Sequence, residues 1–235
     1  MPSRTLSVRE VKVATPRTRL ISLDLADAPF PFSAGQAVMV GLHGSPLRKP
    51  YSIASSPAET DRLRLLELLV QLDTTDALDP HLELASAGTR LDVDGPFGSF
   101  GLPGHIGASP IMFVAGGTGI APLRSMLIER LATASMTIAV VYSARSPEEL
   151  AYRSELEALA AAGRIEVHFT VTRDAGPAWQ GRHGRIDESL LRSALPSPDA
   201  LCFLCGPPQL VRNTADILRT IGVPQDRILA ERYDQ

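Results

Sequence analysis

The chain has 235 residues, of which 44% are hydrophobic and 21% charged, a composition typical of globular proteins that excludes disordered and fibrous classes. Its 23 basic and 26 acidic residues give a formal net charge of −3, which argues against nucleic-acid binding because such proteins present a strongly basic face. No stretch has the roughly 18 uninterrupted apolar residues of a membrane span and the amino terminus has no signal-peptide core, so we expect a cytoplasmic protein without a membrane partner.

Up to about residue 103 the sequence consists of short alternating apolar runs separated by Gly, Pro and Ser. Runs of this kind without helical patterns between them predict an antiparallel β-barrel or sandwich. The expected strands are residues 6–14, 18–26, 34–43, 50–57, 63–72 and 89–95, with one short helix near 79–88.

After Pro110 apolar runs of about five residues alternate with longer stretches of helical period. This alternation predicts a doubly wound parallel α/β sheet. The expected strands are 111–115, 136–143, 164–171, 200–205 and 227–231, and the expected helices are 121–132, 147–162, 187–195 and 208–222. Gly, Pro and Ser cluster in residues 102–110, which predicts two domains, 1–103 and 108–235.

A glycine-rich turn, FVAGGTGIAPLRSML at 113–127, joins the first of these later strands to a helix. Gly116, Gly117 and Gly119, with Thr118 between them, let backbone amides approach an anion at the helix amino terminus, and a pyrophosphate is the natural ligand. The spacing differs from the G-x-G-x-x-G fingerprint. Taken alone, the motif is equally consistent with a tight turn that binds nothing.

The motif CGPP at 205–208 ends the fourth strand of the same sheet. Ligands of open α/β sheets collect at the carboxyl ends of strands, so Cys205, Gly206 and Pro207 are expected at the same crevice as the glycine-rich turn. Cys202 is predicted to be a buried small hydrophobe. The two cysteines face opposite sides of a strand, which argues against a redox disulfide, and they are the only two in the chain, as in a reducing compartment.

Six motifs occur in an order that resembles the ferredoxin–NADP reductase superfamily: AGQAV (34–38), KPYS (49–52), GPFGSF (95–100), GGTGIAP (116–122), CGPP (205–208) and ERY (231–233). Each motif is weak alone, but six in sequence across nearly the whole chain are specific. The resemblance implies a flavin-binding antiparallel barrel followed by a nicotinamide-nucleotide domain. Two cysteines are too few for a fused iron–sulfur domain.

The resemblance implies that the KPYS strand holds the flavin. The ring of Tyr51 lies on the isoalloxazine or ribityl portion, and the hydroxyl of Ser52 bonds the hydride-accepting nitrogen. The family's arginine two places before the tyrosine is Lys49 here, and an ammonium cannot make the bidentate phosphate contact of a guanidinium. Arg48 is a candidate substitute, although neighbouring strand residues point opposite ways, and Pro50 completes the flavin-binding set.

A second flavin-phosphate motif of the family aligns with DALDPHL. Asp76 and Asp79 stand where the family has a glycine and a hydroxyl, and a carboxylate facing a pyrophosphate would repel it. Either the carboxylate turns away or the flavin tail sits differently, and FAD remains the expected cofactor, with FMN as the alternative.

For the nicotinamide cofactor, the resemblance implies a hydroxyl–arginine pair at the end of the third strand, matched by Thr172 and Arg173. Guanidinium groups suit a terminal phosphate, so NADPH is expected, with NADH possible. The further candidates for this pocket, for which solvated surface side chains are the alternative reading, are Ser143, Arg145, Arg182 and Arg185.

At the carboxyl end, the resemblance implies that the ring of Tyr233 covers the flavin face and that Glu231 assists proton or charge balance. A frayed terminus is the alternative, because chain ends commonly fray. Ser52 and Cys205 complete the set of expected catalytic residues. No metal is predicted, since the five histidines show no metal-ligand spacing.

The predicted function is an NAD(P)H-dependent flavoprotein reductase. Hydride passes from nicotinamide to bound FAD, and electrons then pass to a small redox protein, namely a ferredoxin, a flavodoxin or an oxygenase component. Two alternatives remain open: a flavin reductase that uses diffusible flavin, and an electron-transfer subunit of a larger complex.

Overall fold

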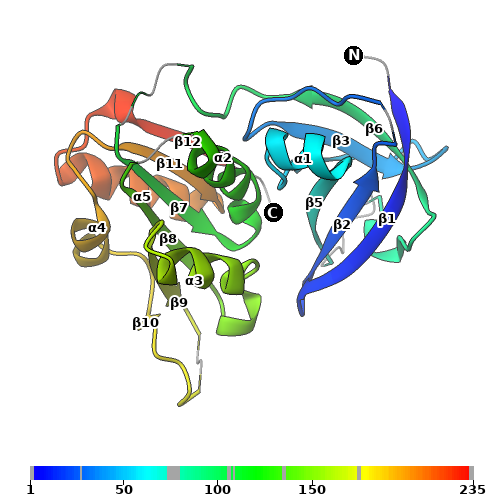
Figure 1. Cartoon of the computed structure of the whole chain (residues 1–235). Helices are drawn as coiled ribbons and strands as arrows, with labels where there is room; N and C mark the ends of the chain where they lie inside the picture. Colours follow the sequence, from blue (N-terminus) through cyan, green and yellow to red (C-terminus); the bar gives the residue numbers. More distant parts are fainter. Residues whose placement is uncertain are drawn as a thin grey trace. The chain divides into compact units, whose positions relative to one another are not determined.

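The computed structural model describes residues 3–26, 28–72, 80–104, 107, 109–133, 136–173 and 176–232 (Figure 1). Contacts divide the chain into two units. The first comprises Met1–Leu102 and Arg124–Arg130, and the second comprises Pro103–Leu123 and Leu131–Gln235. No helix among the described residues is long and apolar enough to cross a membrane.

The first unit contains a six-stranded antiparallel sheet in the order β4-β3-β6-β1-β2-β5. The end strands meet at a single bridge between Ile53 and Leu68, so the sheet is barrel-like without being closed. The antiparallel architecture expected from the alternating runs is confirmed. The strands are β1 (Arg4–Thr15), β2 (Thr18–Asp24), β3 (Ala37–Leu42), β4 (Lys49–Ser52), β5 (Leu65–Gln71) and β6 (Arg90–Phe97).

Alternation along these strands builds the core of the first unit. Leu6 pairs with Leu91 across β1 and β6, and Val40 pairs with Val93 across β3 and β6. All four side chains are buried in one apolar cluster, and Asp92, between Leu91 and Val93, is buried in polar contacts instead. One buried and one solvated face is the usual arrangement of an antiparallel sheet.

A helix that the sequence interpretation did not predict, α1 (Pro57–Leu63), lies between β4 and β5. Ser56 is its N-cap and forms a capping box with Glu59, and Pro57 occupies the first turn. The helix ends at Arg64, whose φ of 55° is left-handed. The helix expected near 79–88 is only a single 3-10 turn, η1 (Leu82–Leu84).

Arg124 and Ser125 belong to the first unit by their contacts. The Arg124 guanidinium donates to both carboxylate oxygens of Glu59 at 3.0 Å and to the Ala54 carbonyl at 2.9 Å. The Ser125 hydroxyl donates to the Ser55 carbonyl at 2.8 Å. Burial raises the pKa of Glu59, but the hydrogen bonds and charge of Arg124 outweigh it and leave that pKa below its ordinary value.

The second unit contains a six-stranded parallel sheet in the order β10-β9-β8-β7-β11-β12, which confirms the doubly wound α/β prediction. Its strands are β7 (Ile111–Gly116), β8 (Ile138–Ala144), β9 (Glu166–Val171), β10 (Arg182–His183), β11 (Leu201–Gly206) and β12 (Ile228–Arg232). Helix α2 (Ile120–Thr133) is divided between the units, because Arg124–Arg130 belongs to the first. The other helices of the second unit are η2 (Gly117–Gly119), η3 (Pro147–Glu149), α3 (Arg153–Ala161), α4 (Glu188–Ala194), α5 (Pro208–Thr220) and η4 (Gln225–Arg227). The two-residue β10 was not predicted, and the helix expected at 147–162 is divided into η3 and α3.

Strands β7, β8 and β11 are buried along their whole length, as expected for parallel strands covered on both faces. Helices α4 and α5 pack on one face through a cluster that includes Met112, Cys202 and Leu204. The chain runs from β7 outward to β10 and then returns to β11 beside β7 (Figure 1). The strand order therefore reverses between β7 and β11, where open α/β sheets bind ligands.

Candidate flavin and nucleotide sites

Three motifs of the first unit meet at the start of β3. Ala37 pairs with Ser52 of β4 on one side and with Phe97 of β6 on the other. The Ile53 amide donates to the Gln36 carbonyl at 2.9 Å, which extends the β3–β4 pairing. The segments 34–38, 49–52 and 95–100 therefore form one continuous surface, although they are far apart in the sequence.

A close approach at Gly35 and a hydrogen bond from Gln36 hold this surface together. Gly35 has a φ of +100°, and a side chain there would lie 2.6 Å from the Phe100 carbonyl oxygen. The Gln36 side chain donates from Nε2 to the Gly98 carbonyl at 3.1 Å. The AGQAV turn thus packs directly against the GPFGSF loop.

The residues of β4 are accessible to a ligand. Lys49, Tyr51 and Ser52 are half-buried and Pro50 is exposed. Tyr51 stands opposite Val38 and packs against the edge of the apolar core, which fixes its ring. β4 therefore carries an anchored aromatic ring and, at the next position, a partly exposed hydroxyl.

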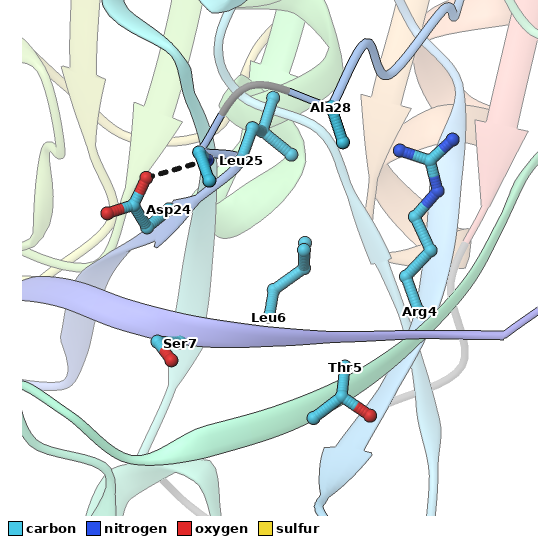
Figure 2. A pocket seen from close by; sticks show the side chains of 8 residues that line it. Arg4, Thr5, Leu6, Ser7, Asp24, Leu25 and Ala28 are labelled. Atoms are coloured by element: carbon cyan, nitrogen blue, oxygen red, sulfur yellow. Dashed lines mark hydrogen bonds between the residues drawn. The ribbon is translucent and has the colours of Figure 1, made fainter.

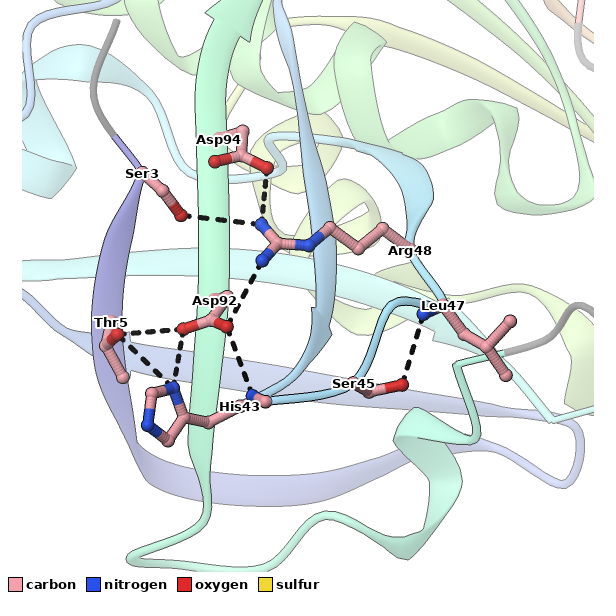
Figure 3. A network of polar contacts seen from close by, with 9 residues as sticks. Ser3, Thr5, His43, Ser45, Leu47, Arg48, Asp92 and Asp94 are labelled. Carbon is pink, nitrogen blue, oxygen red and sulfur yellow. Dashed lines mark hydrogen bonds and ion pairs between the residues drawn. The ribbon is translucent and has the colours of Figure 1, made fainter.

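Arg48 is directed away from this strand and toward two carboxylates of β6 (Figure 3). Its Nη2 lies 3.2 Å from Asp92 Oδ2, and its Nη1 forms an ion pair with Asp94. The arginine stem passes over Gly41 of β3, where a Cβ would lie 2.9 Å from Arg48 Cγ and 2.1 Å from the Leu47 carbonyl oxygen. The absence of a side chain at Gly41 is what lets Arg48 reach β6.

Asp92 is the centre of the polar network in Figure 3. Its Oδ1 accepts from Thr5 Oγ1 at 2.8 Å and lies 2.8 Å from His43 Nδ1, and its Oδ2 accepts from the Gly44 amide at 3.3 Å. The hydrogen bond from His43 is the largest of the effects that lower the pKa of Asp92 to about 2, with burial opposing it. The network ties the loop that precedes β4 to β1 and β6.

Figure 2 shows a separate pocket of about 560 Å³ on the first unit. Arg4 donates to the Pro29 carbonyl at 2.7 Å, and Asp24 accepts from Arg9 and from the Ala26 amide, both at 2.9 Å. The described lining residues are Arg4, Thr5, Leu6, Ser7, Asp24, Leu25, Ala26 and Ala28. None of these eight belongs to a candidate flavin motif, so the pocket has no part in the candidate sites.

In the second unit, the loops after β7 and β11 touch. Gly206 has a φ of +153°, and a side chain there would meet the Gly116 backbone at 3.0 Å. A side chain at Gly116 would lie 2.7 Å from Leu210 and 2.9 Å from Pro207. Gly117, in contrast, has a φ of +55° and no atom within 4 Å of the position of a Cβ. Two glycines close the contact between the loops, and the third leaves an open, left-handed turn at the start of a helix.

The residues expected to bind a 2′-phosphate lie at the carboxyl ends of β8 and β9. The Thr172 amide donates to the Ala144 carbonyl at 3.1 Å, and the Arg173 amide donates to the Arg145 carbonyl at 2.9 Å. Ser143 is buried within β8, whereas Thr172 and Arg173 are exposed. Parallel pairing thus brings these four positions to one edge of the sheet.

Arg182 has a different environment. Its guanidinium forms an ion pair with Asp187, the N-cap of α4, and its carbonyl accepts from Trp179 Nε1 at 3.1 Å. The Arg153 guanidinium stacks over the Trp179 ring at 5.1 Å from the centroid. Trp179 therefore anchors its loop, and Arg182 has an acidic partner within the protein. Arg185 is exposed in the loop that follows β10.

Cys205 and Glu231 are brought together at the carboxyl ends of β11 and β12. They are register partners, and Cys205 Sγ lies 4.0 Å from Glu231 Oε2. Burial raises the pKa of Glu231, which favours its protonated form. Cys202 packs in the apolar cluster beneath α4 and α5, and burial raises the pKa of its thiol to about 12. Both cysteines are free thiols. Tyr233 lies outside the described residues, as do Asp76 and Asp79.

Two polar residues escaped the sequence interpretation. Asp92 is a charged residue that is 7% exposed within a strand, and Tyr142 is a fully buried tyrosine in the otherwise apolar run IAVVY. A buried polar group must find a partner, so each position carried a signal. Neither sequence pattern identifies the partner.

Comparison with known proteins places the chain in a family. The model of the oxidoreductase NAD-binding domain matches residues 113–216. The chain is 36% identical over 237 residues to ferredoxin–NADP reductase B of Sorangium cellulosum (strain So ce56), covering 95% of each chain. It is 28% identical to NADH-cytochrome b5 reductase 1 of Meyerozyma guilliermondii, over 86% of this chain and 72% of that one.

Among solved structures, the cytochrome P450 reductase GcoB of Amycolatopsis matches 98% of this chain and 70% of its own, with a TM-score of 0.84 and 28% identity. The chain therefore belongs to the ferredoxin–NADP reductase family of flavin- and NAD(P)-dependent oxidoreductases. The resemblance carried by the six motifs is confirmed.

Proposed function

We propose that the chain is an NADPH-dependent flavoprotein reductase in which residues 1–103 hold FAD and residues 108–235 bind the dinucleotide. The observation that carries the proposal is the contact of the β7 and β11 loops at Gly116 and Gly206, with an open turn at Gly117. This arrangement lies where the strand order reverses, in a chain of a family that uses these cofactors.

The first unit has donor groups that fit a flavin. The Tyr51 ring supports the isoalloxazine or ribityl portion, and the Ser52 hydroxyl is the hydrogen-bond donor to the hydride-accepting nitrogen. Because Arg48 pairs with Asp92 and Asp94, we assign the countercharge of the flavin phosphate to Lys49. Bound FAD supplies the redox chemistry by accepting hydride from a nicotinamide and releasing electrons to another acceptor.

The second unit has an open cradle that fits a diphosphate. Backbone amides of residues 117–119, at the start of a helical segment, bind the phosphates with support from the helix dipole. Arg145, Thr172 and Arg173 recognise the 2′-phosphate, which favours NADPH. Arg182 contributes less, because Asp187 already neutralises it. NADH is the alternative hydride donor, because one relative is named as an NADH-cytochrome b5 reductase.

Cys205 and Glu231 serve the reacting end of the dinucleotide. Cys205 stands at the carboxyl end of β11 and orients the nicotinamide, and Glu231, whose pKa is raised by burial, lies beside Cys205. Each role keeps water from the reacting atoms or fixes their geometry.

The electron acceptor is a separate redox protein, a ferredoxin, a flavodoxin or an oxygenase component. Relatives named as ferredoxin reductase and cytochrome P450 reductase support this class of acceptor. A second candidate function is reduction of diffusible flavin. The pairing of Arg48 with two carboxylates supports it, because one lysine grips a flavin phosphate less firmly than an arginine.

Mass identification and stoichiometry of the flavin extracted from purified protein separate the two functions. The proposal predicts FAD at about one per chain, and NADPH oxidation with ferricyanide by the isolated chain at a higher kcat/KM than with NADH. Rapid loss of flavin on gel filtration, with activity restored only by added free flavin, supports the second function instead. A folded chain that oxidises neither nucleotide without a partner chain indicates the electron-transfer subunit.

A further inference from the structure

Tyr142 places a hydroxyl inside a strand that is otherwise apolar up to that point. All seven residues of β8 are buried, and Tyr142 is among the largest fully buried side chains of the protein. Its ring packs against Phe169 of β9 with centroids 6.4 Å apart. A hydroxyl at such a position is tolerated only when it is hydrogen-bonded.

The hydroxyl of Tyr142 contacts the glycine-rich turn at the carboxyl edge of the sheet. It donates to the Gly117 carbonyl at 3.0 Å. Burial raises the pKa of Tyr142 well above its ordinary value, so the hydroxyl keeps its proton and remains a donor. The Gly117 carbonyl also accepts from the Ile120 amide, so two donors orient it.

The direction of the Gly117 carbonyl determines the direction of the next amide. A peptide unit is planar and trans, so the carbonyl oxygen of Gly117 and the N–H of Thr118 point in opposite directions. The oxygen is turned inward, toward the buried hydroxyl of Tyr142. The Thr118 N–H is therefore directed away from the interior. The first amides of a helical segment have no partner within it and are available to a ligand.

We propose that Tyr142 is a positioning residue for dinucleotide binding, whose hydroxyl orients the Gly117–Thr118 peptide so that the Thr118 amide donates to the diphosphate. The proposal rests on the proposed function, because it assumes that the turn at Gly117 binds a diphosphate. Tyr142 directly precedes Ser143 on β8, and Arg145 follows the end of that strand. Tyr142 itself is buried and acts through the backbone.

The substitution Tyr142→Phe tests this role because it removes one oxygen and keeps the ring that packs against Phe169. Thr170→Val is the matched control. Thr170 is also fully buried, and its hydroxyl donates to another glycine carbonyl, that of Gly184, at 2.7 Å. It lies on β9, which β8 separates from β7 and the glycine-rich turn. Each variant loses one hydrogen bond from a buried hydroxyl, but only the hydrogen bond of Tyr142 orients the Gly117 carbonyl.

Calorimetric titration of the oxidised, flavin-loaded protein with NADP+, NAD+ and 2′-AMP measures the effect. We expect Tyr142→Phe to raise the Kd of both dinucleotides by the same factor, about three- to tenfold, as the net value of one hydrogen bond predicts. The Kd of 2′-AMP, which lacks the diphosphate, should stay within about twofold, and Thr170→Val should leave the dinucleotide Kd values unchanged. In turnover, KM should rise while kcat stays nearly constant.

The outcomes separate this inference from the function on which it rests. A wild-type protein that binds neither dinucleotide overturns both. Wild-type binding with an unchanged Kd in Tyr142→Phe, or an equal loss of 2′-AMP affinity, overturns only the role of Tyr142. If the variant does not fold, amide NMR of the wild type is the test. The Thr118 amide resonance should shift on addition of NADP+ or NAD+ and not on addition of 2′-AMP. A Thr118 resonance that does not shift with either dinucleotide contradicts the inference.

Discussion

Replacing Asp92 with asparagine should destabilise the first unit, because the carboxylate accepts from several donors in a nearly water-free position. Thr5, His43, Arg48 and the Gly44 amide all lie within 2.8–3.3 Å of its two oxygens, and its side chain is 10% exposed. An asparagine keeps one acceptor oxygen. Its NH2 group takes the place of the second carboxylate oxygen and faces the donors that were hydrogen-bonded to it. The substitution therefore removes the charged acceptor that Arg48 and three solvent-exposed donors share, and hydrogen bonds to a charged group are the stronger ones.

Two routes to the magnitude agree. Breaking a fully buried ion pair costs about 3–5 kcal/mol, and the partial exposure of the Arg48 partner reduces this to about 2–3 kcal/mol. The pKa of Asp92 is about 2 in the folded state against an ordinary 3.8, and a difference of that size corresponds to about 2 kcal/mol. Because the folded pKa is the lower one, this stability is fully present above about pH 4 and is lost as the pH falls through about 2.

Urea unfolding followed by far-ultraviolet circular dichroism measures the effect. At neutral pH the variant should be about 2 kcal/mol less stable than the wild type, and the gap should shrink as the pH falls below about 4. Asp24→Asn is the control, since Asp24 and its partner Arg9 are 39% and 42% exposed, and the loss should stay under about 1 kcal/mol. Equal stability of Asp92→Asn and wild type at neutral pH, or a gap independent of pH, would refute the reasoning.

Two further predictions concern the nucleotide. Arg173→Ala should raise KM for NADPH by about 10- to 100-fold, which is the effect of losing one charge-assisted hydrogen bond, and should raise KM for NADH far less. An equal rise for both nucleotides in initial-rate assays would contradict the assigned 2′-phosphate contact. Cys205→Ser should slow hydride transfer in stopped flow by roughly tenfold, less than the ~100-fold of a 1 Å misplacement, with flavin content intact. Cys202→Ser should not slow it, so matching rates for both variants would contradict the placement of Cys205.

The sequence predicted the second unit well because its elements are long or strongly periodic. All five expected strands are present, and only the two-residue β10 and the division of the helix at 147–162 were missed. Helix α1 was overlooked because its seven residues lie between two strands. Its signal was local and readable: Ser56, Pro57 and Glu59 form a capping box with proline in the first turn.

The arrangement of the candidate sites was only partly predictable. The sequence predicted that Cys205 and the glycine-rich turn lie at the same edge of the sheet, because the carboxyl ends of parallel strands lie at one edge. It did not show that Ala37 lies between Ser52 and Phe97, since that depends on long-range strand register. The same limit applies to Arg48, whose carboxylate partners are more than 40 positions away in the chain.

The most direct test of the account is anaerobic stopped-flow mixing of the purified, flavin-loaded chain with NADPH. The account predicts that the visible absorbance of the flavin is lost in a single-turnover reaction without any other protein, faster at low nucleotide concentration with NADPH than with NADH. A folded chain that retains no flavin after reconstitution with FAD, or whose flavin absorbance persists with both nucleotides, would contradict it.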